Sequence, residues 1–186
     1  AREIAAVAVV AFADVMILNC RYEITKQPAA GECTTAAVLP RAGGGRMFLV
    51  KNWDYRSGIM EHIVVLHIEQ ADGTRILGIT EAGQLIREGF NSHGVGICNN
   101  ALKSIHDGQG EGIPVTFLRR KVLAERSFEG AKRTALTARR SVSNNILLAD
   151  GGGRAVDIEA SPLGCEQIEP VADILTHANH FTVRRD

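Results

Sequence analysis

The chain has 186 residues, of which 45% are hydrophobic and 23% are charged, with 21 basic residues against 21 acidic ones. This is the composition of an ordinary globular protein, and a net charge of zero gives no support to a nucleic-acid-binding or membrane surface. The four cysteines and six histidines have no spacing typical of a disulfide framework or a metal site. We therefore expect a reduced, cytoplasmic protein that binds neither a metal nor a cofactor.

Residues 3–24 are predicted to be helical. The opening stretch "AREIAAVAVVAFADVMIL" resembles a signal peptide in its basic residue, its apolar run and its A-x-A triplet. However, Glu3 interrupts the basic region, and the apolar pattern continues beyond Asp14. These features favour a buried helix. Residues 25–32 contain Pro and Gly and are predicted to be a connector.

A β pattern begins at Thr35. Short runs rich in β-branched residues predict strands in "TAAVL", "RMFLVK", "HIVVLHIE" and "RILGIT", with a hairpin at Asp72-Gly73 between the last two. The segments "GQLIREGF" (83–90) and "VGICNNAL" (95–102) follow, joined by the turn tetrad 91–94.

The periodicity then changes to three and four residues. It predicts helices in "VTFLRRKVLAER" (115–126) and "SFEGAKRTALTA" (127–138), with Ser127 as the N-cap of the second. Strand character returns in "NNILLAD" and "RAVDIEA", which a triple-glycine turn separates, and "DILTHANHF" (173–181) closes the pattern. A sheet, a pair of helices and a second set of strands predict an α+β fold with antiparallel strands.

The chemistry of the chain centres on Cys33, which lies between a Pro/Gly-bearing approach and a strand of small residues. A lone cysteine is most often a packed core thiol. Asp54 follows about one hairpin later, so antiparallel pairing is expected to return its carboxylate to the side of Cys33. An acidic residue embedded in an apolar strand needs a hydrogen-bond partner, and an ammonium group would serve.

Several short motifs occur in an order that resembles a known family. They are Cys33-Thr34-Thr35, Asn52-Trp53-Asp54, "FNSHGVGICNNAL" and "THANHF", with supporting similarity in "ADVMILNCRYEI" and "VDIEASP". Together they resemble the acyl-coenzyme A:isopenicillin N acyltransferase-like family of N-terminal nucleophile hydrolases, which is related to the choloylglycine hydrolases. The resemblance covers nearly the whole chain.

This resemblance implies a four-layer αββα sandwich formed by one domain over residues 1–186. It also implies an inactive precursor in which Cys33 attacks the preceding carbonyl and frees itself as a new N-terminus. Residues 1–32 would then be the precursor segment and residues 33–186 the start of the catalytic segment, and the two are expected to stay associated. Members of the family extend beyond both ends of this chain, so we expect the sandwich to be incomplete at both ends.

The implied chemistry is an N-terminal cysteine activated by its own α-amine. A free α-amine has a pKa of roughly 7.7–8, so it can take the thiol proton near neutral pH. Asp54 would hold the ammonium form, and Asn179 would donate its amide to the oxyanion, a contribution worth roughly 10²–10³ in rate. Asn99 or Asn100 would add oxyanion or substrate contacts, and we name Asn100 as the substrate-binding candidate.

Two residues depart from the family pattern. Glu32 precedes the nucleophile where Gly is common, and Lys51 replaces the Arg found three residues before the aspartate in related hydrolases. The sequence thus predicts an enzyme that breaks a carbon–nitrogen amide bond of a small molecule and passes the acyl group to water or to an amine. The alternative from another class is a ligand-binding protein of the same fold that never matures.

Overall fold

The computed structural model describes residues 1–25 and 32–183, in which two antiparallel sheets are formed. The larger sheet has seven strands in the order β3-β4-β5-β6-β7-β8-β9, and the smaller sheet has three in the order β10-β1-β2. The strands are β1 (Cys33–Val38), β2 (Phe48–Trp53), β3 (Ile63–Glu69), β4 (Arg75–Glu81), β5 (Glu88–Asn91), β6 (Val95–Ala101), β7 (Asn144–Asp150), β8 (Ala155–Ser161), β9 (Gly164–Ile168) and β10 (Ile174–His177). The α+β class with antiparallel strands is confirmed.

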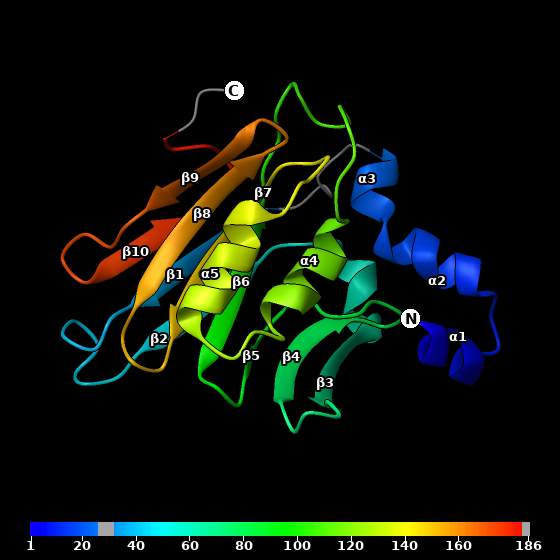
Figure 1. Cartoon of the computed structure of the whole chain (residues 1–186), viewed down its shortest axis with the longest axis horizontal. Helices are drawn as coiled ribbons and strands as arrows, with labels where there is room; N and C mark the ends of the chain where they lie inside the picture. Colours follow the sequence, from blue (N-terminus) through cyan, green and yellow to red (C-terminus); the bar gives the residue numbers. More distant parts are fainter. Residues whose placement is uncertain (26–31, 184–186) are drawn as a thin grey trace.

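The helices are α1 (Arg2–Ala8), α2 (Phe12–Asn19), α3 (Arg21–Thr25), α4 (Val115–Val122) and α5 (Phe128–Thr137), with a 3₁₀ helix, η1 (Ser57–His62). Figure 1 shows α4 and α5 covering one face of the large sheet, while the small sheet lies behind its other face. Helices α1–α3 lie beyond the β3–β4 edge in the same view. The small sheet is therefore covered on one face only, by the large sheet. Phe48 and Val50 on its outer face are exposed.

Strand alternation divides the hydrophobic core into two parts. On β7, Ile146 and Leu148 pack toward α4 and α5, whereas Leu147 packs between the two sheets with Ala37 and Leu175. Both faces of the central strands are thus buried, which explains the continuous apolar run in "NNILLAD". The space between the sheets is the layer that contains the candidate site.

Two local signals in the sequence are confirmed at the ends of elements. The Ser127 hydroxyl accepts a hydrogen bond from the Gly130 amide at 3.1 Å and caps α5. Between β3 and β4, the Thr74 amide donates to the Asp72 carboxylate at 3.0 Å, and Gly73 takes the left-handed conformation, with φ at 82°. These contacts fix the residue at which the helix begins and the residues at which the hairpin turns.

The prediction of a buried N-terminal helix is wrong in two respects. The segment is helical, but it breaks into α1, α2 and α3, because Val9 takes a left-handed conformation and Ala11 an extended one. Its apolar side chains are also largely exposed, with Val9 at 90% and Ile17 at 58%. Apolar residues here recur on all sides of short helices, so only Ala5, Val15 and a few others can face the rest of the protein.

Three further differences concern strands and the connector. Of residues 83–90, only those from Glu88 onward form a strand, because a turn after β4 occupies the first part. Strand β9, "GCEQI", has no strong β pattern and was not predicted from the sequence. Most of the predicted connector, residues 26–31, lies outside the described residues.

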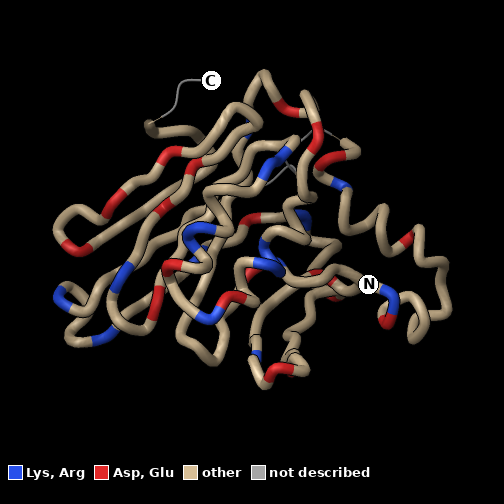
Figure 2. Tube along the Cα trace, viewed as in Figure 1, with Lys and Arg blue, Asp and Glu red and all other residues tan. Residues whose placement is uncertain are grey.

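Charged side chains of both signs are interspersed along the trace (Figure 2), in agreement with the net charge of zero. None of the helices in residues 1–25 and 32–183 has the length and apolar composition that crossing a bilayer requires.

Candidate active site

Cys33 begins β1 and lies directly opposite Trp53, the last residue of β2. Side chains of directly opposed residues project from the same face of an antiparallel pair. The Cys33 side chain therefore shares with Trp53 the face that is turned toward the large sheet, and Cys33 is only 8% exposed. The thiol thus lies at the margin of the layer between the sheets.

The peptide bond between Glu32 and Cys33 is held at both of its ends. The carbonyl oxygen of Glu32 accepts a hydrogen bond from the Asp54 amide at 2.8 Å. The amide of Cys33 donates to the side-chain oxygen of Asn179. The side-chain amide of Asn179 is itself fixed, because it donates to the carbonyl of Ala101 at 2.8 Å. Three predicted site residues, Cys33, Asp54 and Asn179, therefore meet around this bond.

The side chain of Asp54 does not follow the expectation. Asp54 is exposed and lies just beyond β2, not embedded in an apolar strand. Its carboxylate accepts a hydrogen bond from the Asn52 side chain at 3.1 Å, on the face opposite to Trp53. In the register of β1 and β2, Trp53 lies opposite Cys33. Because side chains alternate along a strand, the Asp54 side chain points to the other face. Asp54 contacts the site through its backbone amide.

Asn100 is fully buried between the sheets. Its side-chain amide donates to the Thr35 hydroxyl at 2.9 Å and to the His177 carbonyl at 3.1 Å. The neighbouring Asn99 faces the other way and donates to the Arg87 carbonyl at 2.8 Å. Asn100 therefore ties β6 to both β1 and β10, and the prediction that it contacts substrate stays a prediction.

Charged side chains gather around Cys33. Lys51 forms an ion pair with Glu88 at 2.5 Å, and both side chains are almost completely buried. The guanidinium of Arg87 lies 4.4 Å from the centre of the Trp53 ring. Burial raises the pKa of the Cys33 thiol and Glu88 adds to this, while Lys51 and Arg87 act in the opposite direction. Desolvation is the largest of these influences, so the thiol stays protonated near neutral pH.

A second polar group, which was not predicted from the sequence, lies next to the loop that carries Asn179. Asp157 and Glu159, both on β8, have fully buried side chains, and the His177 ring lies 2.8 Å from Glu159. Glu159 also accepts hydrogen bonds from the amide and hydroxyl of Thr182 and from the amide of Val183. The sequence signal for this group is the pair of acidic residues in the otherwise apolar run "AVDIEA". Asp157 and Glu159, unlike Asp54, are buried acids that have hydrogen-bond partners.

No group of three or more His, Cys, Asp or Glu side chains in the described part of the chain is arranged to hold a metal ion. Cys98 packs into the core between the sheets, and burial raises the pKa of its thiol to about 12. Cys20 and Cys165 are half-buried. Cys98 and Cys165 therefore contribute to the packing of the two core clusters.

Comparison with known proteins gives one matching family. Residues 41–185 match the family described as acyl-coenzyme A:6-aminopenicillanic acid acyl-transferase, a range that begins after Cys33 and includes Asp54, Asn100 and Asn179. The 40 kDa form of acyl-coenzyme A:6-aminopenicillanic-acid-acyltransferase from Emericella nidulans is 28% identical over 170 residues. That alignment covers 90% of this chain and 46% of the relative, so the chain spans less than half of the relative's length.

Two solved structures have a similar fold. The Caenorhabditis elegans ortholog of N-acylethanolamine-hydrolyzing acid amidase superimposes with a TM-score of 0.66 at 18% identity, covering 81% of this chain and 71% of that one. A mutant of the conjugated bile acid hydrolase from Clostridium perfringens gives 0.57 at 16% identity, covering 81% and 54%. At these identities the likeness is one of fold alone.

Proposed function

Because the chain belongs to the acyl-coenzyme A:6-aminopenicillanic acid acyl-transferase family and has an N-terminal nucleophile hydrolase fold, we propose that it is a self-processing cysteine enzyme acting on amide bonds. Residues 1–186 form one domain, which cleavage between Glu32 and Cys33 divides into two associated segments. The substrate is a small-molecule amide or acyl donor. The acyl group passes through a thioester on Cys33 to water or to an amine.

One observation carries this proposal: the Glu32–Cys33 peptide bond is held at its carbonyl by the Asp54 amide and at its nitrogen by Asn179. When the Cys33 sulfur attacks the Glu32 carbonyl carbon, negative charge develops on the oxygen that the Asp54 amide already contacts. A donor in that place stabilises the tetrahedral intermediate. The carbon–nitrogen bond then breaks, and the proton lost by the thiol ends on the departing nitrogen, which becomes a free amine beside Asn179. A thioester then joins Glu32 to Cys33.

Hydrolysis of that thioester gives the Glu32 carboxylate and an N-terminal Cys33 with a free α-amine. Because burial keeps the thiol protonated, a base is required, and the new amine lies on the same residue. In turnover the amine takes the thiol proton, the sulfur attacks the substrate carbonyl, and the protonated amine returns a proton to the departing nitrogen. Water or an amine acceptor then attacks the thioester.

The supporting residues have separate proposed roles. Asn179 lies against the nitrogen of Cys33, where it can orient the α-amine and, after reorientation, donate to the substrate oxyanion. Asp54 acts through its backbone amide, which donates to the Glu32 carbonyl, and Lys51 lies on the inner face of the neighbouring strand. The four cysteines are free, which supports the expectation of a reducing, cytoplasmic setting.

The proposal is tested by the intact mass of the purified chain. We expect two segments, one ending at Glu32 and one beginning at Cys33, and a single uncleaved chain for Cys33→Ala. Cys165→Ala is the matched control, since Cys165 lies on β9 and contacts the Leu136 carbonyl of α5 on the other face of the large sheet, and it should be cleaved normally. Amide turnover by a chain whose Glu32–Cys33 bond is intact would refute the mechanism. A chain that neither cleaves nor forms a thioester would instead be the non-catalytic ligand-binding alternative.

A further inference from the structure

Two buried arginines lie beside the candidate site. Arg87 and Arg119 are 6% and 4% exposed, and the Nε atom of each has no hydrogen-bond partner among the described residues. The Arg87 guanidinium lies over the ring of Trp53, which is the residue opposite Cys33. A guanidinium group keeps its charge even when it is buried, so it requires an anion or a polar partner close by.

Tyr22 on α3 faces these arginines. The Arg21 guanidinium donates to the Tyr22 hydroxyl oxygen at 3.2 Å, and the guanidinium of Arg119 lies 5.6 Å from the centre of the Tyr22 ring. Within residues 1–25 and 32–183, that hydroxyl donates to no acceptor. The Tyr22 oxygen therefore acts as an acceptor of hydrogen bonds, which is the only role open to a phenolate.

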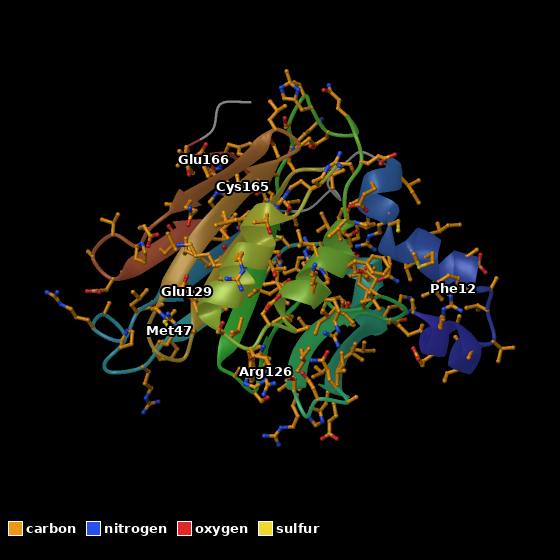
Figure 3. All side chains as sticks on the ribbon, viewed as in Figure 1. Phe12, Met47, Arg126, Glu129, Cys165 and Glu166 are labelled. Atoms are coloured by element: carbon orange, nitrogen blue, oxygen red, sulfur yellow. The ribbon has the colours of Figure 1, made fainter. Side chains whose placement is uncertain are left out.

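Contacts between α3 and α4 hold Tyr22 in this place. The Glu23 carboxylate accepts a hydrogen bond from the Val115 amide at 2.8 Å, and the Tyr22 ring packs against Val115 and Val142. Phe12, labelled in Figure 3, marks the outer side of the same segment and is 43% exposed. The inner side of the segment thus presents the phenol to the arginines.

The charges of this cluster do not balance without Tyr22. Four cations come from α3, β2, α4 and the residue before β5, and three carboxylates face them from α3, β4 and β5. Among the described residues, these groups are Arg21, Lys51, Arg87, Arg119, Glu23, Glu81 and Glu88. One positive charge therefore remains, and a Tyr22 phenolate would neutralise it.

The two arginines act on both Tyr22 and Cys33. Burial by itself raises the pKa of the Tyr22 phenol, but Arg87, Arg119 and Arg21 outweigh burial and lower this pKa from 10 to about 8. Burial also raises the pKa of the Cys33 thiol, and Arg87 and Arg119 are among the groups that oppose it. The phenol and the thiol are thus influenced by the same pair of guanidinium groups.

We propose that Tyr22 is a positioning residue of the active site, supplied by residues 1–32, and that its phenolate is the counter-ion of Arg87 and Arg119. While Tyr22 is protonated, the two arginines stabilise a thiolate at Cys33. Once Tyr22 loses its proton to solvent, part of their charge is neutralised, so Tyr22 limits the reactivity of the sulfur at high pH. The proposal rests on the proposed role of Cys33 as the nucleophile.

The first measurement concerns the ionisation of Tyr22 alone. Tyr22 and Tyr55 are the only tyrosines of the chain, so Tyr55→Phe leaves one phenol to titrate by its near-ultraviolet absorbance. Its midpoint should be about 8 and not the ordinary value of 10. Adding Arg119→Met should raise the midpoint, whereas Arg119→Lys, which keeps the charge, should leave it low. An ordinary midpoint in the Tyr55→Phe chain would overturn the proposal, even if Arg119→Met does not fold.

The second measurement is the rate at which iodoacetamide alkylates Cys33, from about pH 6 to about pH 10, in chains of the same cleavage state. Tyr22→Phe should react as the parent does below about pH 7, because Tyr22 keeps its proton there. At about pH 9 it should react at least about threefold faster, because no phenolate forms beside the arginines.

Tyr55→Phe is the matched control for the alkylation. It makes the same change in a ring that stacks on Trp53 and also lies near Arg87, and it should follow the parent at every pH. If Tyr22 were merely structural, Tyr22→Phe would change the rate by a factor that does not depend on pH, and that result would overturn the proposal.

Neither measurement requires turnover or cleavage. If the Glu32–Cys33 bond is never cleaved, the proposed function fails, while the midpoint of Tyr22 and its coupling to Cys33 can still be measured in the intact chain. If the chain is cleaved and active but the pH profiles of Tyr22→Phe and the parent coincide, only the role of Tyr22 is refuted.

Discussion

At the scale of single residues, Cys33 combines a raised thiol pKa with a peptide nitrogen that the proposed cleavage would convert into a free amine. Burial opposes ionisation of the thiol, and Lys51 and Arg87 compensate only in part. An intact peptide nitrogen at Cys33 cannot accept a proton, whereas the free amine produced by cleavage can. The reactivity of this sulfur should therefore depend on whether the Glu32–Cys33 bond is intact.

Alkylation by iodoacetamide as a function of pH measures this dependence. In the uncleaved fraction of Asn179→Ala, the variant expected to cleave most slowly, Cys33 should react slowly, with a midpoint above that of an ordinary thiol of about 8.5. In the cleaved chain it should react faster, and at lower pH. Peptide mass mapping gives each rate, and Cys98, whose pKa is raised to about 12, is the internal reference that should stay unlabelled. Equal Cys33 rates in both forms would contradict activation by the amine.

Asn179 offers an acceptor to Cys33 and a donor to Ala101, and two variants separate these roles. Asn179→Asp keeps the acceptor and loses the donor, while Asn179→Ala loses both. If the amide donates to the substrate oxyanion, fully processed Asn179→Asp should have a kcat lower by roughly 10²-fold with little change in KM. A near-normal kcat for processed Asn179→Asp would show that only the acceptor matters. Cleavage itself should be slowest in Asn179→Ala.

At the scale of elements, β8 supports the loop that carries Asn179. Glu159 contacts His177 before that residue and Thr182 and Val183 after it, so one carboxylate holds both ends of residues 178–183. These contacts lower the pKa of Glu159 to about 2 in spite of its burial. Asp157, which accepts from Asn145, lacks such donors from the loop. The position of Asn179 thus depends on a strand that is distant in sequence.

The stability of this region should decrease as Asp157 ionises. Burial raises the pKa of Asp157 from 3.8 to about 6, with Glu159 adding and His177 and Asn145 opposing. The folded chain therefore binds more protons than the unfolded chain, so this contribution is complete below about pH 4 and is lost as pH rises through about 6. Asp157→Asn should remove that loss.

Urea unfolding of the parent and of Asp157→Asn at about pH 5 and about pH 7 makes the comparison, and the difference between the two chains isolates the carboxyl. Glu159 does not affect this comparison. Because its pKa is lowered from 4.5 to about 2 in the folded chain, its contribution to stability is complete above about pH 4.5 and is lost only as the pH falls toward about 2. Equal changes of the unfolding free energy with pH in the two chains would contradict the prediction.

Elements with a regular period were predictable from the sequence, and their relative placement was not. The run "NNILLAD" gives β7 with its exact bounds, and Ser127 caps α5, because both depend on nearby residues. The meeting of Cys33 with Asn179 came from the family resemblance, since 146 residues separate them. The side-chain direction of Asp54 depends on a register that places Trp53 opposite Cys33, and a shift by one residue would reverse it.

At the scale of the whole molecule, the segment before Cys33 is attached through a few buried contacts. The side chain of Asn19 donates to the Gly83 carbonyl at 3.0 Å and accepts from the Leu85 amide at 2.9 Å. Arg21 forms an ion pair with Glu81 at 2.5 Å. All three partners lie after the proposed cleavage point, so these contacts do not depend on an intact chain.

The two segments should therefore elute together in gel filtration after cleavage. The double variant Asn19→Ala, Arg21→Ala should release residues 1–32, because each buried group left without a partner costs about 1–3 kcal/mol. Arg2→Ala is the control, since Arg2 contacts Phe12 within the same segment, and it should elute as the parent does. A double variant whose segments still elute together would place the main attachment elsewhere.

The two hydrogen bonds that hold the Glu32–Cys33 bond have a consequence for the order of events during synthesis. One comes from the Asp54 amide, one hairpin away, and the other involves Asn179, which leaves the ribosome long after Cys33. Asn179 reaches its place only when β10 has joined β1 and when β6 offers the Ala101 carbonyl. A chain with misassembled sheets lacks these two contacts and keeps the nitrogen of Cys33 in a peptide bond, so its thiol lacks the base that would activate it. Cleavage would therefore operate as a quality checkpoint, which releases a reactive sulfur only on molecules whose distant parts have already come together.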